Sequence, residues 1–520
     1  MRFNIKDTYC NPIVLPDYSV FDAIHFTLEA NDVWGRGDKK LLDEMAIARE
    51  FGAPEDESPF FENVAPGYGK EPANDVRTTA DPSVYCFDGT YYLYSSGGQV
   101  YSSDDLVNWE VHYDDSWMKI SEPMAPTVEE WNGKYYATAN SVPLQVSDNP
   151  IGPWSTVGDW ILPDGREFVC GDPMLFRDDD NKMYLYFGMG GHIIGAQLDE
   201  AQPNQLVTEP KVLISFNKEN YWERWGSCNE NWGIGFVEGS WMLKHNNRYY
   251  LVYSSAGTEF YAYAMACYTS DSPLGHFLPQ AKNPVSRNRS GLLKGGGHGS
   301  FVKGPDDTLW IFYTVFAGID HAMERRIGMD PAGFDEEGNL FALTGCEVPQ
   351  FKPGILQRPE KGNATELVTL TQLKGTKVSS CAPGRNSMYA LDESLSTWWQ
   401  PAAEDPEPVF AVALQGAYYI SALRIMWKDI GMDLQAGVLP GAYRYVVEYT
   451  QDVFHEDWKM LVDASENETD LTVDYRTFDS VRAQAVRIRI VGAPEGITPG
   501  LMNFTVFGES IHKTHCQSVQ

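Results

Sequence analysis

Apolar, aromatic-rich residues recur in five short runs along the chain, each entered from a tight turn. An aromatic-rich run after a turn that carries Gly, Asn or Asp is typical of a β-strand in a hairpin. Another short apolar strand precedes each run, at a spacing of 10 residues from Asp81 to Tyr91 and 11 from Asp172 to Met183. This near-constant spacing predicts five copies of one structural unit. The runs are GTYYLYSS from Gly89, GKYYATAN from Gly133, NKMYLYFG from Asn181, NRYYLVYSS from Asn247 and DTLWIFYT from Asp307.

A Ser-Asp turn that leads to an aromatic residue follows three of the runs and marks a third element of the unit. These turns are SSDDLVNW ending at Trp109, VSDNPIGPW ending at Trp154 and TSDSPLGHF ending at Phe277. Successive units begin 44, 47, 66 and 60 residues apart, which is enough for four strands and their loops. The repeats therefore predict a five-bladed β-propeller.

The innermost strands of a propeller line a central channel, so equivalent positions at their starts are expected to converge around its axis. The five residues at these starts are Asp81, Ala125, Asp172, Glu238 and His298. Three carboxylates in one channel are costly because of desolvation and like-charge repulsion. The cluster therefore predicts a functional site, with a structural ion site as the alternative.

Clustered carboxylates suit glycoside hydrolysis, which needs a protonated acid at the leaving oxygen and an ionised partner across the sugar ring. Glu238 lies in the aromatic sequence FVEGSW. Burial there is expected to raise its pKa and to keep the carboxyl protonated. We therefore assign Glu238 as the candidate general acid.

The motifs of the region from about Asn11 to Gly354 resemble those of glycoside hydrolase family 43. TTADPSVYCFDGTYYLYSS is similar to the family's general-base strand, and CGDPMLF to the strand of its pKa-modulating aspartate. VEGSWMLKHNNRYYLVYSS is similar to its general-acid strand, GGGHGSFV to its channel histidine motif, and HAMERRIGMD to its substrate-contacting arginine segment. The resemblance implies that Asp81 is the base, Asp172 the modulator and Glu238 the acid, with inversion of configuration.

The resemblance also implies roles for residues around the acids. His298 is expected to hold a water or a calcium ion in the channel, with a satisfied core histidine as the alternative. Of Arg325 and Arg326, one is expected to bind sugar hydroxyls or Asp172, and the other to be an ordinary charge at a strand edge. Trp241 is a further candidate substrate contact.

The chain departs from the family's usual pattern near its start. NPIVLPDY resembles the family's lead-in, but about 60 extra residues separate it from TTADPSV. Within them KKLLDEMAIAREFG has the apolar spacing of a short amphipathic helix, which we expect on the outside of the propeller. A cap over the pocket and a dimer contact are the alternatives. Asp17 and Asp22 are rival base candidates outside the repeat spacing.

The composition of the chain limits the classes of molecule that it is expected to bind. A net charge of −32 argues against nucleic acid and against an anionic membrane surface, since both attract positive charge. The eight cysteines form no CxxC pair and show no metal-ligand spacing, so we expect mostly free thiols. The opening residues MRFNIKDTYCNPIVLP lack the pattern of a signal peptide. The expectation is a cytoplasmic protein, or a secreted one if the sequence was trimmed.

A second domain is expected after the Pro- and Gly-marked linker. Its segments KVSSCAPGRNSMYALDESLSTWWQP, PVFAVALQGAYYISALRIMWK, YRYVVEYTQD and VRAQAVRIRIVG resemble a discoidin-like, or coagulation-factor C-type, β-sandwich. We expect this domain to support the neighbouring one, with carbohydrate binding as the alternative. Trp398 and Trp399 are expected in its core, with sugar stacking as the alternative, and the loop around Asp392 is a candidate structural calcium site by analogy.

The sequence thus predicts an all-β protein, with a five-bladed β-propeller followed by a jelly-roll or discoidin-like β-sandwich. The expected bounds are 1–355 for the propeller with an insertion at about 18–75, 356–364 for the linker, 365–510 for the sandwich and 511–520 for a tail. No cofactor is expected to be required beyond the candidate calcium.

The predicted function is an inverting exo-glycosidase that releases a terminal α-L-arabinofuranose or β-D-xylose from plant-derived oligosaccharides. Galactofuranose is an alternative sugar and a retaining mechanism an alternative reaction. A non-catalytic carbohydrate-binding protein is the alternative from another class. The oligomeric state is left open.

Overall fold

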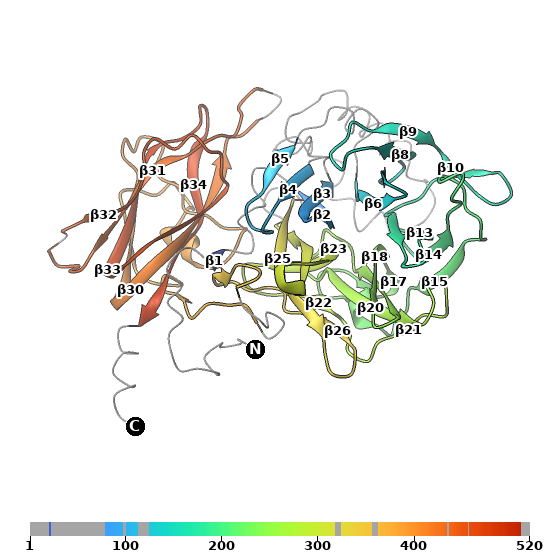
Figure 1. Cartoon of the computed structure of the whole chain (residues 1–520). Coiled ribbons are helices and arrows are strands. Elements are labelled where there is room, and N and C mark those ends of the chain that lie inside the picture. Colours follow the sequence, from blue (N-terminus) through green and yellow to red (C-terminus); the bar gives the residue numbers. More distant parts are fainter. Residues whose placement is uncertain are drawn as a thin grey trace. The chain divides into compact units, whose positions relative to one another are not determined.

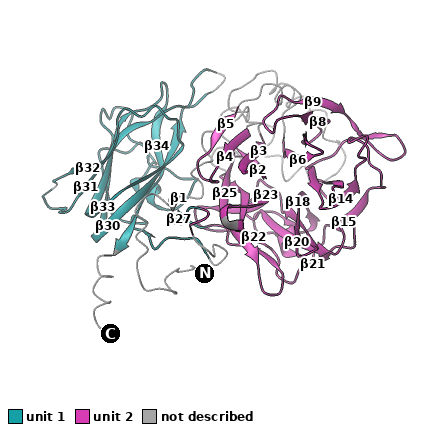
Figure 2. Ribbon diagram, viewed as in Figure 1, with its two compact units in different colours: residues 1–29, 346–352, 362–520 teal, residues 30–345, 353–361 magenta. Residues whose placement is uncertain are grey.

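The computed structural model of the chain describes residues 20–21, 79–96, 100–112, 124–317, 324–355, 362–433, 436–455 and 457–510. The amphipathic helix expected in KKLLDEMAIAREFG, the rival bases Asp17 and Asp22, and the tail lie outside these residues. Figure 2 shows two compact units: one comprises residues 30–345 and 353–361, the other 1–29, 346–352 and 362–520. Within the described ranges, no helix has the length and apolar character needed to cross a membrane.

Four antiparallel strands form each of five consecutive sheets in the first unit. The sheets are β2 Ala80–Phe87, β3 Thr90–Ser96, β4 Val100–Ser103 and β5 Glu110–His112; β6 Thr127–Trp131, β7 Lys134–Thr138, β8 Leu144–Ser147 and β9 Ser155–Gly158; β12 Met174–Arg177, β13 Met183–Phe187, β14 His192–Gln197 and β15 Lys211–Ser215; β18 Val237–His245, β19 Arg248–Ser255, β20 Ala264–Ser270 and β21 Leu278–Pro279; and β23 Lys294–Lys303, β24 Leu309–Phe316, β25 Arg325–Phe334 and β26 Leu340–Ala342.

Smaller elements lie between the blade strands along the chain. They are β10 Trp160–Ile161 paired with β11 Glu167–Phe168, β16 Arg224–Trp225 paired with β17 Asn231–Gly235, β22 Ser286–Arg287 on β20, and the 3-10 helices η3 Tyr221–Glu223 and η4 Pro305–Asp307. In the second unit, β1 Val20–Phe21 pairs with β27 Gln350–Phe351.

The five sheets close into a ring, as the colours from blue to yellow show in Figure 1. Each innermost strand contacts the next one around the ring, in the order β2, β6, β12, β18, β23, and β23 returns to β2. The predicted five-bladed propeller is therefore confirmed. The predicted aromatic runs are the second strands of the blades, β3, β7, β13, β19 and β24.

A β-bulge interrupts the innermost strand near its start. The pairing with the second strand shifts between Ala80 and Ser83 in β2, between Glu238 and Trp241 in β18, and between Gly297 and Ser300 in β23. At every innermost strand, one residue at this point has left-handed backbone geometry: Asp81 (φ 53°), Ala125 (52°), Asp172 (44°), Gly239 (53°) and His298 (33°). A bulge with a left-handed residue changes the direction of the strand and re-aims its side chains.

The fourth blade corrects one sequence prediction. The position equivalent to Asp81 is Gly239, and Glu238 stands one residue before it. The β18–β19 hairpin has the two-residue connection that β2–β3 also has, whereas β12–β13 and β23–β24 are joined by five residues. Counting 11 residues back from Tyr249, as suits the blades with five-residue connections, therefore reached Glu238, whereas the equivalent position Gly239 lies 10 residues back.

The second unit consists of long antiparallel strands in the order β28-β34-β30-β33-β31-β32, with β29 added to β30. This strand-rich unit is the C-terminal β-sandwich that the sequence predicts. Its elements are β28 Val368–Thr369, β29 Thr376–Val378, η6 Ser387–Leu391, β30 Val409–Ile430, β31 Arg444–Thr450, β32 Lys459–Ala464, β33 Val473–Gly492 and β34 Thr498–Ser510.

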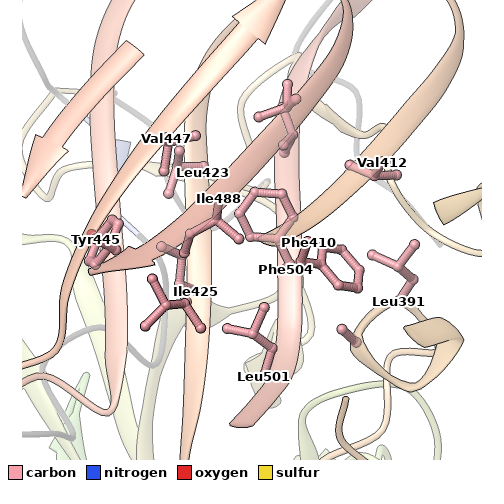
Figure 3. Close-up of a cluster of buried hydrophobic side chains, with 14 of the residues drawn as sticks. Leu391, Phe410, Val412, Leu423, Ile425, Tyr445, Val447, Ile488, Leu501 and Phe504 are labelled. Atoms are coloured by element: carbon pink, nitrogen blue, oxygen red, sulfur yellow. The ribbon is translucent and has the colours of Figure 1, made fainter. Parts of the chain in front are cut away.

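The core of this second unit is apolar. Figure 3 shows Leu391 from η6, Phe410 and Leu423 from β30, Ile488 from β33 and Phe504 from β34 meeting in it. Side chains of such size stabilise a fold by about 1.5–3 kcal/mol each when they are fully buried. This cluster gives the second unit a core of its own.

Two sequence predictions concern the adjacent tryptophans of this unit. Trp399 is fully buried, as expected, and packs against Phe410. Trp398 is half-buried, and the guanidinium of Arg385 lies 3.5 Å from its ring centre. Sugar stacking on Trp398 would have to displace this cation from one face of the ring.

Candidate active site

The three acids that the sequence singled out lie together at the start of the innermost strands. Asp81 is on β2, Asp172 lies two residues before the first residue of β12, and Glu238 is on β18; each is at most 7% exposed. His298 on β23 stands between two of them, because its Nδ1 lies 3.3 Å from Asp81 Oδ1 and 3.7 Å from Asp172 Oδ2. The structure thus brings His298 to the acids instead of leaving it in an apolar core.

Asp81 is surrounded by hydrogen-bond donors and positive charge. Nη1 of Arg325 lies 3.2 Å from Asp81 Oδ2 and 3.3 Å from Oδ1, and the hydroxyl of Ser96 donates a hydrogen bond to Oδ2. Burial alone would raise the pKa of Asp81, but the charges of Arg325 and His298 and the hydrogen bonds from Ser96 and Arg325 lower it below its ordinary value. Asp81 is therefore ionised at neutral pH.

Glu238 has the opposite environment. Burial first, and then repulsion by Asp172 and Asp81, raise its pKa well above the ordinary value. The hydroxyl of Tyr263 donates to Glu238 Oε1 at 2.5 Å, and this bond opposes the shift only in part. The carboxyl of Glu238 therefore keeps its proton to a higher pH than an exposed glutamate does.

Asp172 links the other two acids. Burial and the charge of Asp81 raise its pKa, while His298 and the side chain of Asn140 act in the opposite direction. Its Oδ2 accepts the backbone N–H of Gly239 at 3.1 Å. Since Gly239 directly follows Glu238, this bond ties the position of the Glu238 backbone to Asp172.

A ring of side-chain-to-backbone hydrogen bonds joins the blades beside the acids; we call these bonds the blade latches. In four of the five blades, the residue opposite the bulge accepts the N–H of the left-handed residue in the next blade. These latches run from Ala125 N to Ser96 Oγ (2.8 Å), from Asp172 N to Asn140 Oδ1, from His298 N to Ser254 Oγ (2.7 Å) and from Asp81 N to Thr314 Oγ1 (3.0 Å).

The third blade breaks this pattern. Gly188 is the residue opposite its bulge, since its N–H bonds to the carbonyl of Gly171. Gly188 has a φ of +147°, and a Cβ there would lie 2.0 Å from the carbonyl oxygen of His192, so no side chain fits. The Gly239 N–H is bonded instead by the Asp172 carboxylate. Asp172 thus has a structural role at this blade boundary beside its electrostatic one.

One of the two predicted arginine roles is wrong. Arg325 contacts Asp81, and its binding of sugar hydroxyls stays a prediction. Arg326 is not a charge at a strand edge, because it is buried and its Nη2 lies 3.1 Å from Oε1 of Glu324, which is also buried. The carboxylate of Glu324 balances the buried charge of Arg326 and allows it to lie inside the blade.

Trp241 is buried and packs against an aromatic residue of another blade. It is 5% exposed, and its ring centre is 5.3 Å from that of Tyr85 on β2, across the ring from β18. The two rings fill the channel between non-neighbouring blades. The structure therefore places Trp241 in packing contact, and substrate contact by this residue stays a prediction.

Sequence reasoning missed several residues of the site. Tyr263 donates to the acid, Thr258 lies 3.3 Å from Arg325, and the half-buried Glu259 has its pKa raised to about 7, first by burial. No repeat signal marks these three, which lie in or near the loop between β19 and β20. Ser96 did carry a signal, because Ser254 holds the same place in the aromatic run of the fourth blade.

The calcium ion expected at His298 stays a prediction. Calcium takes six to eight oxygen ligands, and Asp81 and Asp172 already bind Arg325, Ser96 and the Gly239 N–H, so water would have to supply most of the ligands. In the second unit, the carboxylate of Asp392 accepts bonds from Ser394 N and Thr397 Oγ1. Over the described ranges, no group of three or more His, Cys, Asp or Glu side chains is placed to hold a metal.

The cysteines of the described residues are free thiols. They are Cys86, Cys170, Cys228, Cys267, Cys346 and Cys381. This agrees with the expectation for these six; the other two, Cys10 and Cys516, lie outside the described residues.

Comparison with known proteins agrees with the family resemblance that the motifs of the sequence indicate. Residues 75–340 match the family model described as "Glycosyl hydrolases family 43". A relative from Aspergillus niger, "Beta-D-galactofuranosidase xynD", is 26% identical over 51% of this chain and 82% of its own length. A "Xylosidase/arabinosidase" from Bacteroides ovatus is 26% identical over 39% of this chain and 76% of its own length.

Among solved structures, one titled "Glycoside hydrolase" is 19% identical and covers 82% of this chain and 97% of its own, with a TM-score of 0.45. The family model spans just over half of the 520 residues. It includes every acid of the channel. This chain therefore belongs to glycosyl hydrolase family 43.

Proposed function

We propose that the chain is an inverting exo-glycosidase that releases a terminal pentose, α-L-arabinofuranose or β-D-xylose, from plant-derived oligosaccharides. One observation carries the proposal: two buried carboxyls of the same channel have opposite surroundings, with Arg325 and His298 against Asp81 and repelling acids beside Glu238, which move their pKa values in opposite directions. Glycoside hydrolysis needs this division, with one carboxyl ionised and the other protonated at the same pH.

Each acid has one task in this reaction. Asp81, as its carboxylate, accepts a proton from the attacking water, and Glu238 donates its proton to the leaving glycosidic oxygen. Inversion requires room for the water, which corresponds to a separation of about 6.5–9.5 Å between the two carboxyls. Asp172 raises the pKa of Glu238 by its charge and holds the adjacent backbone through Gly239 N–H.

Arg325 and His298 serve the base. Both lie against Asp81 and favour its ionised form. An ionised carboxylate is a base for water, whereas its protonated form is not, so these two residues keep Asp81 in the reactive state. In our proposal they also face the sugar, since they line the same channel.

The names of the relatives support the choice of a pentose in this proposal. The Bacteroides ovatus protein is named xylosidase/arabinosidase, and a second protein from that species is named "Non-reducing end alpha-L-arabinofuranosidase BoGH43B". The Aspergillus niger relative is named for galactofuranose instead, which is a reason to keep that sugar as the second candidate. The two furanoses differ from each other in the side chain on the ring, and xylopyranose differs from both in ring size, so one panel of substrates separates the three sugars.

The test is release of nitrophenol from arabinofuranoside, xyloside and galactofuranoside substrates, with the anomeric configuration of the first product followed by NMR. Turnover of one pentoside with inversion is the expected result. Retention would indicate a covalent intermediate, which needs carboxyls only about 5–5.5 Å apart. Binding of oligosaccharides without any turnover, unaffected by Glu238→Gln, would point to a carbohydrate-binding protein and overturn the proposal.

A further inference from the structure

Ser96 makes two hydrogen bonds at once, at the last residue of β3. Its Oγ accepts the N–H of Ala125, which latches the first blade to the second, and its hydroxyl proton goes to Oδ2 of Asp81. A serine hydroxyl has one proton and two lone pairs, so the two bonds use different parts of the group. Ser96 is 3% exposed, and water therefore has little access to replace either bond.

Ser254 is the matched residue in the fourth blade. It pairs with Glu238 across β18 and β19 as Ser96 pairs with Ala80 across β2 and β3. It is fully buried, and its Oγ accepts the N–H of His298 at 2.7 Å. The two serines thus share a position in the repeat and a latch, but the bond to Asp81 belongs to Ser96.

We propose that Ser96 is a positioning residue for the general base: its hydroxyl holds the Asp81 carboxylate toward the attacking water, in addition to joining two blades. The proposal rests on the proposed function for the role of Asp81. The geometry supports it because Arg325 Nη1 and Ser96 Oγ contact the carboxylate from β25 and β3, respectively. Donors from two strands fix the plane of a carboxylate better than one does.

Other charged groups also face Asp81. Arg325 and His298 stabilise its ionised form, whereas Asp172, Glu238 and Tyr263 on neighbouring strands or loops are coupled to it electrostatically. Loss of the Ser96 hydroxyl leaves all five in place. Its effect is therefore expected to be a moderate one, and not the loss that removal of Asp81 would produce.

The experiment compares Ser96→Ala, Ser96→Thr and Ser254→Ala with the wild type on the best nitrophenyl glycoside of the panel. A hydrogen bond to a charged group contributes enough for about a tenfold effect. We expect Ser96→Ala to lower kcat about tenfold with little change in KM, and to move the acidic limb of the kcat/KM profile up by about one pH unit. Ser96→Thr should restore both, since Thr314 shows that threonine fits the equivalent position.

Ser254→Ala controls for the loss of a latch. It should lower the Tm to a similar extent as Ser96→Ala. Because it leaves the hydroxyl bond to Asp81 in place and removes a bond only to the backbone of His298, it should move the acidic limb less than Ser96→Ala does. Equal pH profiles for the two alanine variants would overturn the proposal and assign Ser96 to blade joining alone. Failure of Ser96→Thr to recover kcat would also count against it.

A second measurement does not depend on activity. The wild type, Ser96→Ala, Asp81→Ala and the double variant form a double-mutant cycle in which the Tm of each is measured. Alanine suits the left-handed position of Asp81, because Ala125 adopts the same geometry at φ 52°. Residues in direct contact give non-additive effects, so the double variant should lose less than the sum. Additive losses would refute the contact, whereas an inactive wild type would refute only the proposed function.

Discussion

Charged side chains are buried in both the propeller channel and the core of the second unit, but they are balanced differently. In the channel, Asp81, Asp172 and Glu238 have like charge and crowd together, with Arg325 contacting Asp81. In the second unit, each buried acid stands beside an arginine: Arg424 Nη2 lies 3.7 Å from Glu393 Oε2, and Arg476 Nε lies 2.6 Å from Asp474 Oδ1.

This difference in charge balance distinguishes a catalytic site from ion pairs that serve the fold alone. Opposite charges in contact lower the cost of each other's burial, so such a pair can be kept for the fold alone. Like charges close together raise that cost: burial first, and then repulsion by Asp172 and Asp81, raise the pKa of Glu238. A fold retains crowding of this kind where a reaction uses the resulting division of protons.

The largest expected effect is on catalysis in the channel. Glu238→Gln removes the proton donor and little volume, so kcat on natural glycosides should fall by about 10²–10⁴. Substrates with a good leaving group need less protonation and should recover part of this loss. Asp81→Asn should be damaging for both kinds of substrate, because water still needs its base. Equal rescue of both variants by activated substrates would contradict the assignment of acid and base.

In the second unit, removing one member of a buried ion pair should change the stability of the protein instead of its catalysis. Arg424→Met leaves the Glu393 carboxyl buried without this arginine, so we expect a loss of about 3–5 kcal/mol in the free energy of unfolding. Chemical denaturation measures it. The double variant Arg424→Met/Glu393→Leu removes both charges and should be more stable than the single one. An Arg424→Met protein as stable as the wild type would remove the contrast between the two regions.

The channel should also give a bell-shaped pH profile of kcat/KM. The acidic limb belongs to Asp81, whose pKa is lowered, and the alkaline limb to Glu238, whose pKa is raised. The acidic fall should therefore begin below the ordinary aspartate pKa of about 3.9, and the alkaline fall above the ordinary glutamate pKa of about 4.3. In Glu238→Gln, assayed with an activated substrate, the alkaline limb should disappear. A limb that persists in this variant belongs to another group.

The smallest expected effect is a gain in stability from the same substitution. Because the pKa of Glu238 is raised on folding, the unfolded chain loses this proton first as the pH rises above about 4.3, and stability falls over that range. Gln has no proton to lose and can still accept the Tyr263 hydroxyl. Glu238→Gln should therefore raise the Tm at pH 7 by about 2–4 °C, the shift that about 1 kcal/mol produces. Glu230→Gln, at an exposed residue, is the control and should change the Tm little.

The sequence by itself determined the repeat, the class of fold and the identity of the acids. Five aromatic runs with a near-constant spacing predict five blades, because each blade must bury the same faces against its neighbours. Long alternating strands after the linker predict a sandwich. Asp81, Asp172 and His298 also follow from the repeat, since their positions depend on local strand geometry.

Only the tertiary structure decided the rest. Hairpins of two and five residues displace the repeat, so the left-handed position of the fourth blade belongs to Gly239 and not to Glu238. Arg325 reaches Asp81 from a strand 244 residues away along the chain, and Trp241 meets Tyr85 across the channel. Alternation in a strand says which face a side chain is on. What stands opposite that face depends on how the ring closes.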